Sequence, residues 1–358
     1  MPDIINKLAR KELIDMVPYQ SARRLFASGS DNNQRKVWLN ANEASGVGAY
    51  HIDSQNVNRY PDFQPDNLLN AYSQYCQLSK NNILATRGAD EGIELIIRAF
   101  CRAYQDSILI CPPTYGMYAI SAENHGANIV KVPLVANQLD IESLKQQVGK
   151  VKVVFLCSPG NPTGNLLPAS QVIEAINLFK DSAIVVVDEA YIEFSIENTM
   201  APQLEHFEHL IVLRTLSKAF ALAGLRCGFT LASEAIITLL SKIIAPYPIS
   251  APVAEIASEA LQTSLSTMTN RVNETNILRG HLNTWLSNQP WCEEVFTSDA
   301  NFILFRCINT NEKARLFDRL VQHDILIRDQ SKQPQLDNCL RISIGSEQEL
   351  DQLKEVLS

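Results

Sequence analysis

The sequence predicts an α/β fold with a large, mainly parallel sheet flanked by helices and a second, smaller α/β unit. From about residue 83 to 232, short apolar runs rich in β-branched residues alternate with helical stretches, which is the pattern of a parallel sheet. Polar and turn-forming residues come directly after several of these runs. Because ligands of open α/β sheets bind outside the carboxyl ends of the strands, we expect these loops to face one site.

The strands of the large sheet are expected at residues 108–111, 129–132, 151–157, 183–187, 210–213 and 227–231. Helices are expected between them. In the stretch 89–101, Ile93, Ile97 and Phe100 recur at helical spacing and predict an apolar face that packs on the sheet.

The pattern changes near residues 245–252, where prolines interrupt the chain before a long helical segment at about 253–287. This segment is interpreted as a connection between domains. The last seventy or so residues predict the smaller α/β unit, with strands at 301–306, 325–328 and 340–344 and helices at 312–323 and 347–357.

The charge and the cysteines restrict the class of protein. The 358 residues carry 31 basic and 39 acidic side chains, a net charge of -8, which disfavours nucleic-acid and membrane partners. The 8 cysteines form no C-x-x-C pair and are interpreted as buried hydrophobic residues of a reducing compartment. The first residues lack the charged head and apolar run of a signal peptide, so a cytoplasmic location is expected.

One lysine and one carboxylate are expected at neighbouring strand ends. Lys218 follows the apolar run at 210–213, and Asp188 follows the run 183–187, which is apolar enough to be buried on both faces. A lysine after a strand is usually a solvated charge, but a carboxylate at the rim of a buried sheet is costly unless it is paired. The two residues together therefore indicate a cofactor site.

Pyridoxal phosphate requires this combination of groups. Its aldehyde forms a Schiff base with a lysine, and a carboxylate keeps its pyridine nitrogen protonated so that the ring accepts electrons. Its phosphate needs backbone N–H groups at a helix start, hydroxyls and a guanidinium. The candidates for the phosphate are Gly88, Ala89, Asp90, Thr215, Ser217 and Arg226, with Tyr115 to stack on the ring and Asn161 and Tyr191 to bond its phenolic oxygen.

Two other patterns point to no further cofactor. The spacing of His206 and His209 is compatible with a metal site, but a solvated or capping pair is favoured and no metal is expected. The segment 224–228 lacks the spacing of a dinucleotide fingerprint, which argues against a nicotinamide enzyme.

Together these motifs resemble the pyridoxal-phosphate-dependent aminotransferases of the aspartate aminotransferase fold. The likeness lies in the segments 158–164, 188–191 and 217–218, and further segments at 18–24, 38–43, 58–61, 87–91, 111–118 and 214–228 are similar to the histidinol-phosphate aminotransferases. The resemblance covers nearly the whole chain. It implies fold type I, with an N-terminal arm and part of the small domain at 1–40, a large cofactor-binding domain with a seven-stranded sheet at 41–248, and a linking helix and small C-terminal domain at 249–358.

The resemblance also implies how substrates bind. Arg341 corresponds to the arginine that binds the carboxylate of glutamate. Arg328 and Tyr19 correspond to groups that hold the distal phosphate of histidinol phosphate, and Asn42 is expected among the substrate-binding residues. This chain has Gly160 where close relatives often carry Asn, which puts the stiffness of that loop in question.

The implied activity is amino transfer between L-histidinol phosphate and 2-oxoglutarate in histidine biosynthesis, with Lys218 as the catalytic base. The resemblance further implies a homodimer in which Tyr60 reaches the cofactor phosphate of the neighbouring subunit. Alternatives of the same fold are a threonine-phosphate decarboxylase and an aromatic amino acid aminotransferase. A silent cofactor-binding regulator lacks support because no basic helix-turn-helix segment precedes residue 40, and an interaction protein would not need Lys218 and Asp188.

Overall fold

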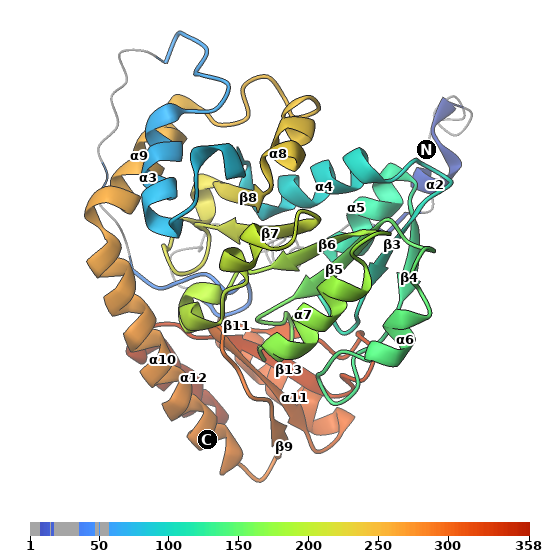
Figure 1. Ribbon diagram of the computed structural model, residues 1–358. Coiled ribbons are helices and arrows are strands. Elements are labelled where there is room, and N and C mark those ends of the chain that lie inside the picture. Colours follow the sequence, from blue (N-terminus) through green and yellow to red (C-terminus); the bar gives the residue numbers. More distant parts are fainter. Residues whose placement is uncertain (1–7, 15, 18–35, 47–49, 51–56) are drawn as a thin grey trace.

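The computed structural model has a large unit built on one sheet and a smaller unit beneath it in the view of Figure 1. It describes residues 8–14, 16–17, 36–46, 50 and 57–358. The predictions for Tyr19 and for the whole segment 18–24 lie outside the described residues. No helix in the described ranges is long and apolar enough to cross a lipid bilayer.

The large sheet has 7 strands in the order β2-β8-β7-β6-β5-β3-β4. The strands are β2 (Ile83–Thr86), β3 (Ser107–Ile110), β4 (Asn128–Lys131), β5 (Val153–Cys157), β6 (Ile184–Asp188), β7 (Leu210–Thr215) and β8 (Gly228–Ala232). The neighbours from β7 to β4 are parallel, and β8 is antiparallel to both β7 and β2. The predicted mainly parallel sheet is therefore confirmed, and the sequence pattern missed the short strand β2.

Helices cover both faces of this sheet, because the central strands β5 and β7 are mostly apolar and are buried at every position. One buried cluster joins alternate strand residues to helices α3 (Asp66–Cys76), α7 (Ala169–Leu178) and α9 (Ala251–Thr263). The other cluster joins the remaining strand residues to α4 (Gly88–Phe100), α5 (Met117–His125) and α8 (Glu234–Ser241). The other helical segments around the sheet are α2 (Lys11–Ile14), η3 (Lys80–Asn82), α6 (Ile141–Lys145), η4 (Ile192–Asn198), η5 (Ala201–Glu205) and η6 (Ala223–Leu225).

The smaller unit is an antiparallel sheet in the order β12-β13-β10-β9 with its own apolar core. Its elements are β9 (Cys292–Val295), β10 (Phe302–Cys307), α11 (Thr310–Gln322), β11 (Ile325–Leu326), β12 (Arg328–Asp329), β13 (Cys339–Ser343) and α12 (Glu347–Leu357). The single strand predicted at 325–328 is two short strands, because β11 pairs with β1 (Val37–Trp38) while β12 pairs with β13. Strand β9 was not predicted.

The helical segment predicted at 253–287 consists of two helices, α9 and α10 (Leu265–Ser287), which meet at Ser264. Ser264 has φ -115° and ψ 15°, outside the helical range, so the predicted helical segment is interrupted at this one residue. Helix α10 runs from the large unit to the small one in Figure 1.

Residues 37–39 join the small unit although they precede the large sheet in the chain. Leu39 is buried in the core of the small unit, donates its N–H to Leu326 and accepts from the N–H of Ser343, both at 2.9 Å. The next residues then enter the space between the two units. The domain limits at 40 and 248 stay a prediction.

Candidate active site

A cavity of about 320 Å³ lies between the carboxyl edge of the large sheet and the small unit. Its walls come from the loops after β3, β5, β6 and β7, the start of α4, the segment 41–43, and strands β12 and β13 with the loop that joins them. Strand ends that are far apart in sequence therefore meet at one site, as the turn residues predicted.

Most of the residues singled out in the sequence line this cavity: Asn42, Ala89, Asp90, Tyr115, Asn161, Asp188, Tyr191, Thr215, Ser217, Lys218, Arg226, Arg328 and Arg341. Gly88 lies next to it at the start of α4. Tyr60 is 82% exposed and lines a separate open groove between α3 and α9, where it stacks on Tyr247 with ring centroids 4.5 Å apart.

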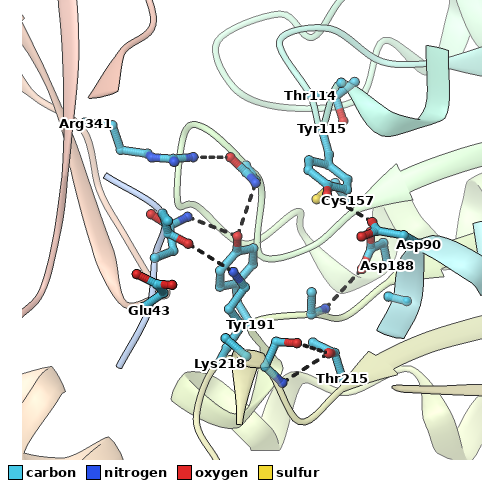
Figure 2. Close-up of a pocket in the computed structure, with 18 of the residues that line it drawn as sticks. Glu43, Asp90, Thr114, Tyr115, Cys157, Asp188, Tyr191, Thr215, Lys218 and Arg341 are labelled. Carbon is cyan, nitrogen blue, oxygen red and sulfur yellow. Dashed lines mark hydrogen bonds between the residues drawn. The ribbon is translucent and has the colours of Figure 1, made fainter. Parts of the chain in front are cut away.

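The Lys218 amine points into the cavity beside Tyr191, as Figure 2 shows. Its Nζ donates to the carbonyl of Ala41 at 3.3 Å and lies 5.5 Å from the centroid of the Tyr191 ring. Burial lowers the pKa of Lys218 to about 8, and the nearby positive charge of Arg341 acts in the same direction. The unprotonated, nucleophilic form of this amine is therefore more populated near neutral pH than in a solvated lysine.

The Asp188 carboxylate also lines the cavity, at the end of strand β6. Its Oδ1 accepts the N–H of Ala190 at 3.1 Å, and its Oδ2 accepts the hydroxyl of Tyr118 at 2.6 Å. Burial raises the pKa of Asp188 to about 6, while these two donors act against the rise because they stabilise the charged form. The sequence reasoning missed Tyr118, although it lies in the segment 111–118 that carries the family likeness.

Tyr191 is held by two amides. Its hydroxyl oxygen accepts from Nδ2 of Asn42 at 3.0 Å and from Nδ2 of Asn161 at 3.1 Å. Burial raises the pKa of Tyr191, so the phenol stays neutral. Since both bonds use the oxygen as acceptor, the hydroxyl proton can be donated to a further group in the cavity.

Arg341 links this arrangement to the small unit. Its guanidinium donates to Oδ1 of Asn161 at 2.5 Å and to the carbonyl of Asn40 at 3.3 Å, and it lies over the ring of Phe302. Asn42 is also tied to the small unit, because its N–H donates to Oγ of Ser343 at 2.8 Å. The substrate role predicted for Asn42 stays a prediction.

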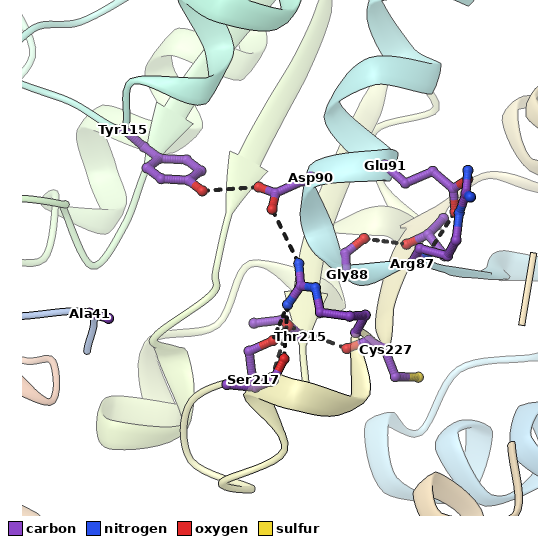
Figure 3. A network of polar contacts seen from close by, with 12 residues as sticks. Ala41, Arg87, Gly88, Asp90, Glu91, Tyr115, Thr215, Ser217 and Cys227 are labelled. Atoms are coloured by element: carbon purple, nitrogen blue, oxygen red, sulfur yellow. Dashed lines mark hydrogen bonds and ion pairs between the residues drawn. The ribbon is translucent and has the colours of Figure 1, made fainter. Parts of the chain in front are cut away.

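An anion cradle forms where α4 begins, as Figure 3 shows. The Arg226 guanidinium donates to Oγ of Ser217 and to Oδ2 of Asp90, both at 3.3 Å. Gly88 has φ +74°, and a side chain at Gly228 would lie 2.5 Å from the carbonyl carbon of Gly88. Glycine at 228 therefore lets strand β8 approach the first N–H groups of the helix, where the helix dipole favours an anion.

Tyr115 lies across the cavity from Lys218, and its hydroxyl donates to Oδ1 of Asp90 at 3.0 Å. Asp90 thus bridges Tyr115 and Arg226. The ring predicted to stack on the cofactor and the guanidinium predicted to bind its phosphate are therefore joined by hydrogen bonds through one carboxylate. The stacking itself stays a prediction.

A buried charge network behind the site was not predicted. The Arg214 guanidinium donates to Glu189 at 2.7 Å, to Glu193 at 3.2 Å and to Oγ1 of Thr199 at 2.8 Å. Glu189 directly follows Asp188, and Arg214 precedes Thr215, so the network supports both strand ends of the site. The sequence did contain a signal for this network, because the charged residues Glu189 and Arg214 each lie at the end of an apolar run.

The histidine pair does not form a metal site in the described part of the chain. The Nε2 atom of His209 contacts the carbonyl of Ile176 at 2.8 Å, and no described group of three His, Cys, Asp or Glu side chains is arranged to hold a metal ion.

Known proteins match the chain over almost its whole length. The model of the family described as aminotransferase class I and II matches residues 26–357. The chain belongs to this family. A histidinol-phosphate aminotransferase of Colwellia psychrerythraea is 67% identical over 99% of both chains, and one of Pseudoalteromonas atlantica is 50% identical over 99% of this chain and 95% of the relative.

Solved structures of this aminotransferase family agree with the fold. The histidinol-phosphate aminotransferase of Sinorhizobium meliloti, in complex with pyridoxal-5'-phosphate, superposes with a TM-score of 0.85 at 25% identity and covers 98% of this chain and 96% of its own. An L-threonine-O-3-phosphate decarboxylase of Porphyromonas gingivalis superposes with a TM-score of 0.70 at 21% identity, over 84% of this chain and 91% of its own. At that identity the likeness concerns the fold alone.

Proposed function

We propose that this aminotransferase uses pyridoxal phosphate to transfer an amino group between L-histidinol phosphate and 2-oxoglutarate, which yields imidazole-acetol phosphate and L-glutamate in the synthesis of histidine. The observation that carries the proposal is one cavity that holds a lysine amine and a buried carboxylate together with Arg328 and Arg341. The identity of 67% to a histidinol-phosphate aminotransferase over the whole chain supports the same activity rather than its same-fold alternatives.

The residues of the cavity fit pyridoxal phosphate. Lys218 would hold the cofactor covalently, and the cradle of Arg226, Ser217 and the first N–H groups of α4 would take its phosphate. The Tyr191 hydroxyl, which accepts two amide bonds, has a proton to give to the phenolic oxygen. Asp188 would face the ring nitrogen. When bound, the cofactor accepts the electron pair left at the substrate Cα after proton removal.

The chain's own residues then handle the proton and the substrate. Lys218 would act as the base at the substrate Cα, and its lowered pKa of about 8 suits proton removal near neutral pH. The donors to Asp188 favour its charged form, and the hydrogen bonds to Tyr191 hold that ring in place. Asp188 and Tyr191 are buried, which keeps bulk water away from these groups.

Two arginines suit the two kinds of substrate. The guanidinium of Arg341 presents a planar fork for the carboxylate of glutamate, and its bond to Asn161 fixes its position over the site. Arg328 enters the same cavity from the neighbouring strand β12, where it suits the distal phosphate of histidinol phosphate. Tyr19 is proposed as a second group for that phosphate.

The protein is further proposed to act in the cytoplasm as a homodimer in which Tyr60 reaches the cofactor phosphate of the second copy. The exposure of Tyr60 and its distance in the fold from its own cavity support this arrangement, since it lines a separate groove. A mixture of Lys218→Ala and Tyr60→Ala copies should regain activity above either variant alone, because a mixed dimer contains one site with both side chains intact.

The proposed function is tested by an assay of the enzyme loaded with pyridoxal phosphate. Histidinol phosphate with 2-oxoglutarate should give stoichiometric glutamate, and initial rates should follow ping-pong kinetics. Lys218→Ala should lose turnover and keep its fold, while Lys180→Ala, a matched change of an exposed lysine, should keep both.

Three other outcomes would contradict the assignment. Release of carbon dioxide from threonine phosphate without need for 2-oxoglutarate would indicate a decarboxylase. Equal turnover of aromatic amino acids without a phosphate would indicate an aromatic aminotransferase. Normal turnover by Lys218→Ala would exclude the role given to that lysine.

A further inference from the structure

We propose that Tyr118 is a positioning residue that keeps the Asp188 carboxylate ionised and fixed toward the cavity. Tyr118 lies in α5 behind the site and is not among the described residues that line the cavity. The inference rests on the proposed function, because it concerns the carboxylate that would face the ring nitrogen of the cofactor.

The geometry fixes the carboxylate from both of its oxygens. Tyr118 donates to Oδ2 at 2.6 Å, within the short range of hydrogen bonds to charged oxygens, and the N–H of Ala190 takes Oδ1 at 3.1 Å. Rotation of the carboxylate would break both bonds. The two hydrogen bonds thus fix the orientation of the Asp188 carboxylate, which lines the cavity.

Tyr118 itself has little freedom to move. Its side chain is fully buried and stacks on Phe155 with ring centroids 4.7 Å apart and planes 11° apart. Tyr115 packs edge-on against it at 5.6 Å. The hydroxyl of Tyr118 is therefore aimed at Asp188 by packing on two sides rather than by the hydrogen bond alone.

The charges around Asp188 make this donor necessary. The titratable groups that face it, besides Tyr118, are Cys157 on β5, Asp90 on α4, Glu189 beside it in the chain and the neutral phenol of Tyr191. Asp90 and Glu189 are negative, and burial raises the pKa of the Cys157 thiol to about 12, which leaves it neutral. Burial also raises the pKa of Tyr118, so its proton stays in place for donation.

Removal of the Tyr118 hydroxyl should change where the proton between the cofactor ring nitrogen and Asp188 resides. Without the bond from Tyr118, the carboxylate of Asp188 becomes a stronger base in a buried site with negative neighbours. A proton shared between the cofactor ring nitrogen and Asp188 then shifts from the nitrogen to the carboxylate, with no other bond made or broken. The ring nitrogen becomes neutral, although every cavity-lining residue is unchanged.

The test compares the parent holoenzyme with Tyr118→Phe and Tyr72→Phe. Tyr72 is a matched control because it is also fully buried on the large sheet and stacks on Phe229, but its hydroxyl has no hydrogen-bond partner in the described structure. Each protein is loaded with pyridoxal phosphate labelled with ¹⁵N in the ring. The ¹⁵N chemical shift reports protonation of the nitrogen, and equilibrium dialysis gives the dissociation constant of the cofactor.

In Tyr118→Phe the nitrogen signal should move toward that of neutral pyridine, and cofactor affinity should fall about tenfold, as expected for loss of a hydrogen bond to a charged group. Tyr72→Phe should match the parent in both the nitrogen chemical shift and the cofactor affinity. An unchanged nitrogen signal in Tyr118→Phe, an equal change in Tyr72→Phe, or loss of fold in Tyr118→Phe before loading overturns the inference. If the loaded parent fails to act on histidinol phosphate, the proposed function fails, while the nitrogen signal still decides the role of Tyr118.

Discussion

Replacement of Arg214 by methionine tests the buried network behind the site. The change keeps an apolar stem but removes a guanidinium that is 3% exposed and donates to Glu189, Glu193 and Thr199. Two carboxylates that are 1% and 3% exposed then lose their positive partner. Because an uncompensated buried charge costs about 3–5 kcal/mol, we expect Arg214→Met to lose about 4 kcal/mol of unfolding free energy.

The loss of unfolding free energy in Arg214→Met should increase with pH. Burial already raises the pKa of Glu193, and Arg214 opposes that rise, so removal of Arg214 raises the pKa of Glu193 further. The folded variant then binds more protons than the unfolded chain in mildly acid solution, and its stability falls as pH increases. The deficit should be larger at about pH 8 than at about pH 5, where protonation removes the buried charge.

Urea unfolding of the cofactor-free protein, followed by circular dichroism at both pH values, measures this deficit. Arg102→Met is the matched control, because Arg102 pairs with Asp106 at 3.0 Å but is 73% exposed, and its loss should cost less than about 1 kcal/mol. A deficit for Arg214→Met that is below about 1 kcal/mol, or equal at the two pH values, would refute the reasoning.

Three further predictions concern the cavity itself. Lys218→Met should stabilise the cofactor-free protein at neutral pH. Thermal unfolding should show this gain in stability shrink as pH rises from about 8 toward 10.5. In that window the folded parent binds fewer protons than its unfolded chain, so the stability of the parent increases with pH. Arg341→Lys keeps the charge but not the fork, so steady-state kinetics should show the KM for glutamate rise about tenfold. Gly228→Ala places a side chain 2.5 Å from the backbone of Gly88 and should weaken cofactor binding in dialysis, whereas Gly280→Ala, with nothing within 4 Å, should leave it unchanged.

Much of the site followed from local patterns along the chain. Asp188 and Lys218 were found because each follows an apolar strand, and parallel strands end at the same edge of a sheet. The parallel core from β3 to β7 followed from the same runs. Strand β2 and the break at Ser264 were missed, because four residues carry little periodic signal and a serine between two helices is no strong breaker.

The sequence by itself therefore determined the α/β class, the strand ends and the groups of the candidate cofactor site, since these depend on periodicity and on short turns. Only the tertiary structure decided which side chains hold those groups. Tyr118 and Asp188 are 70 residues apart, and Asn42 and Tyr191 are 149 apart, yet each pair is hydrogen-bonded. Such partners meet because helices pack on the sheet and residues 37–39 pair with the small unit, and no local pattern records either event.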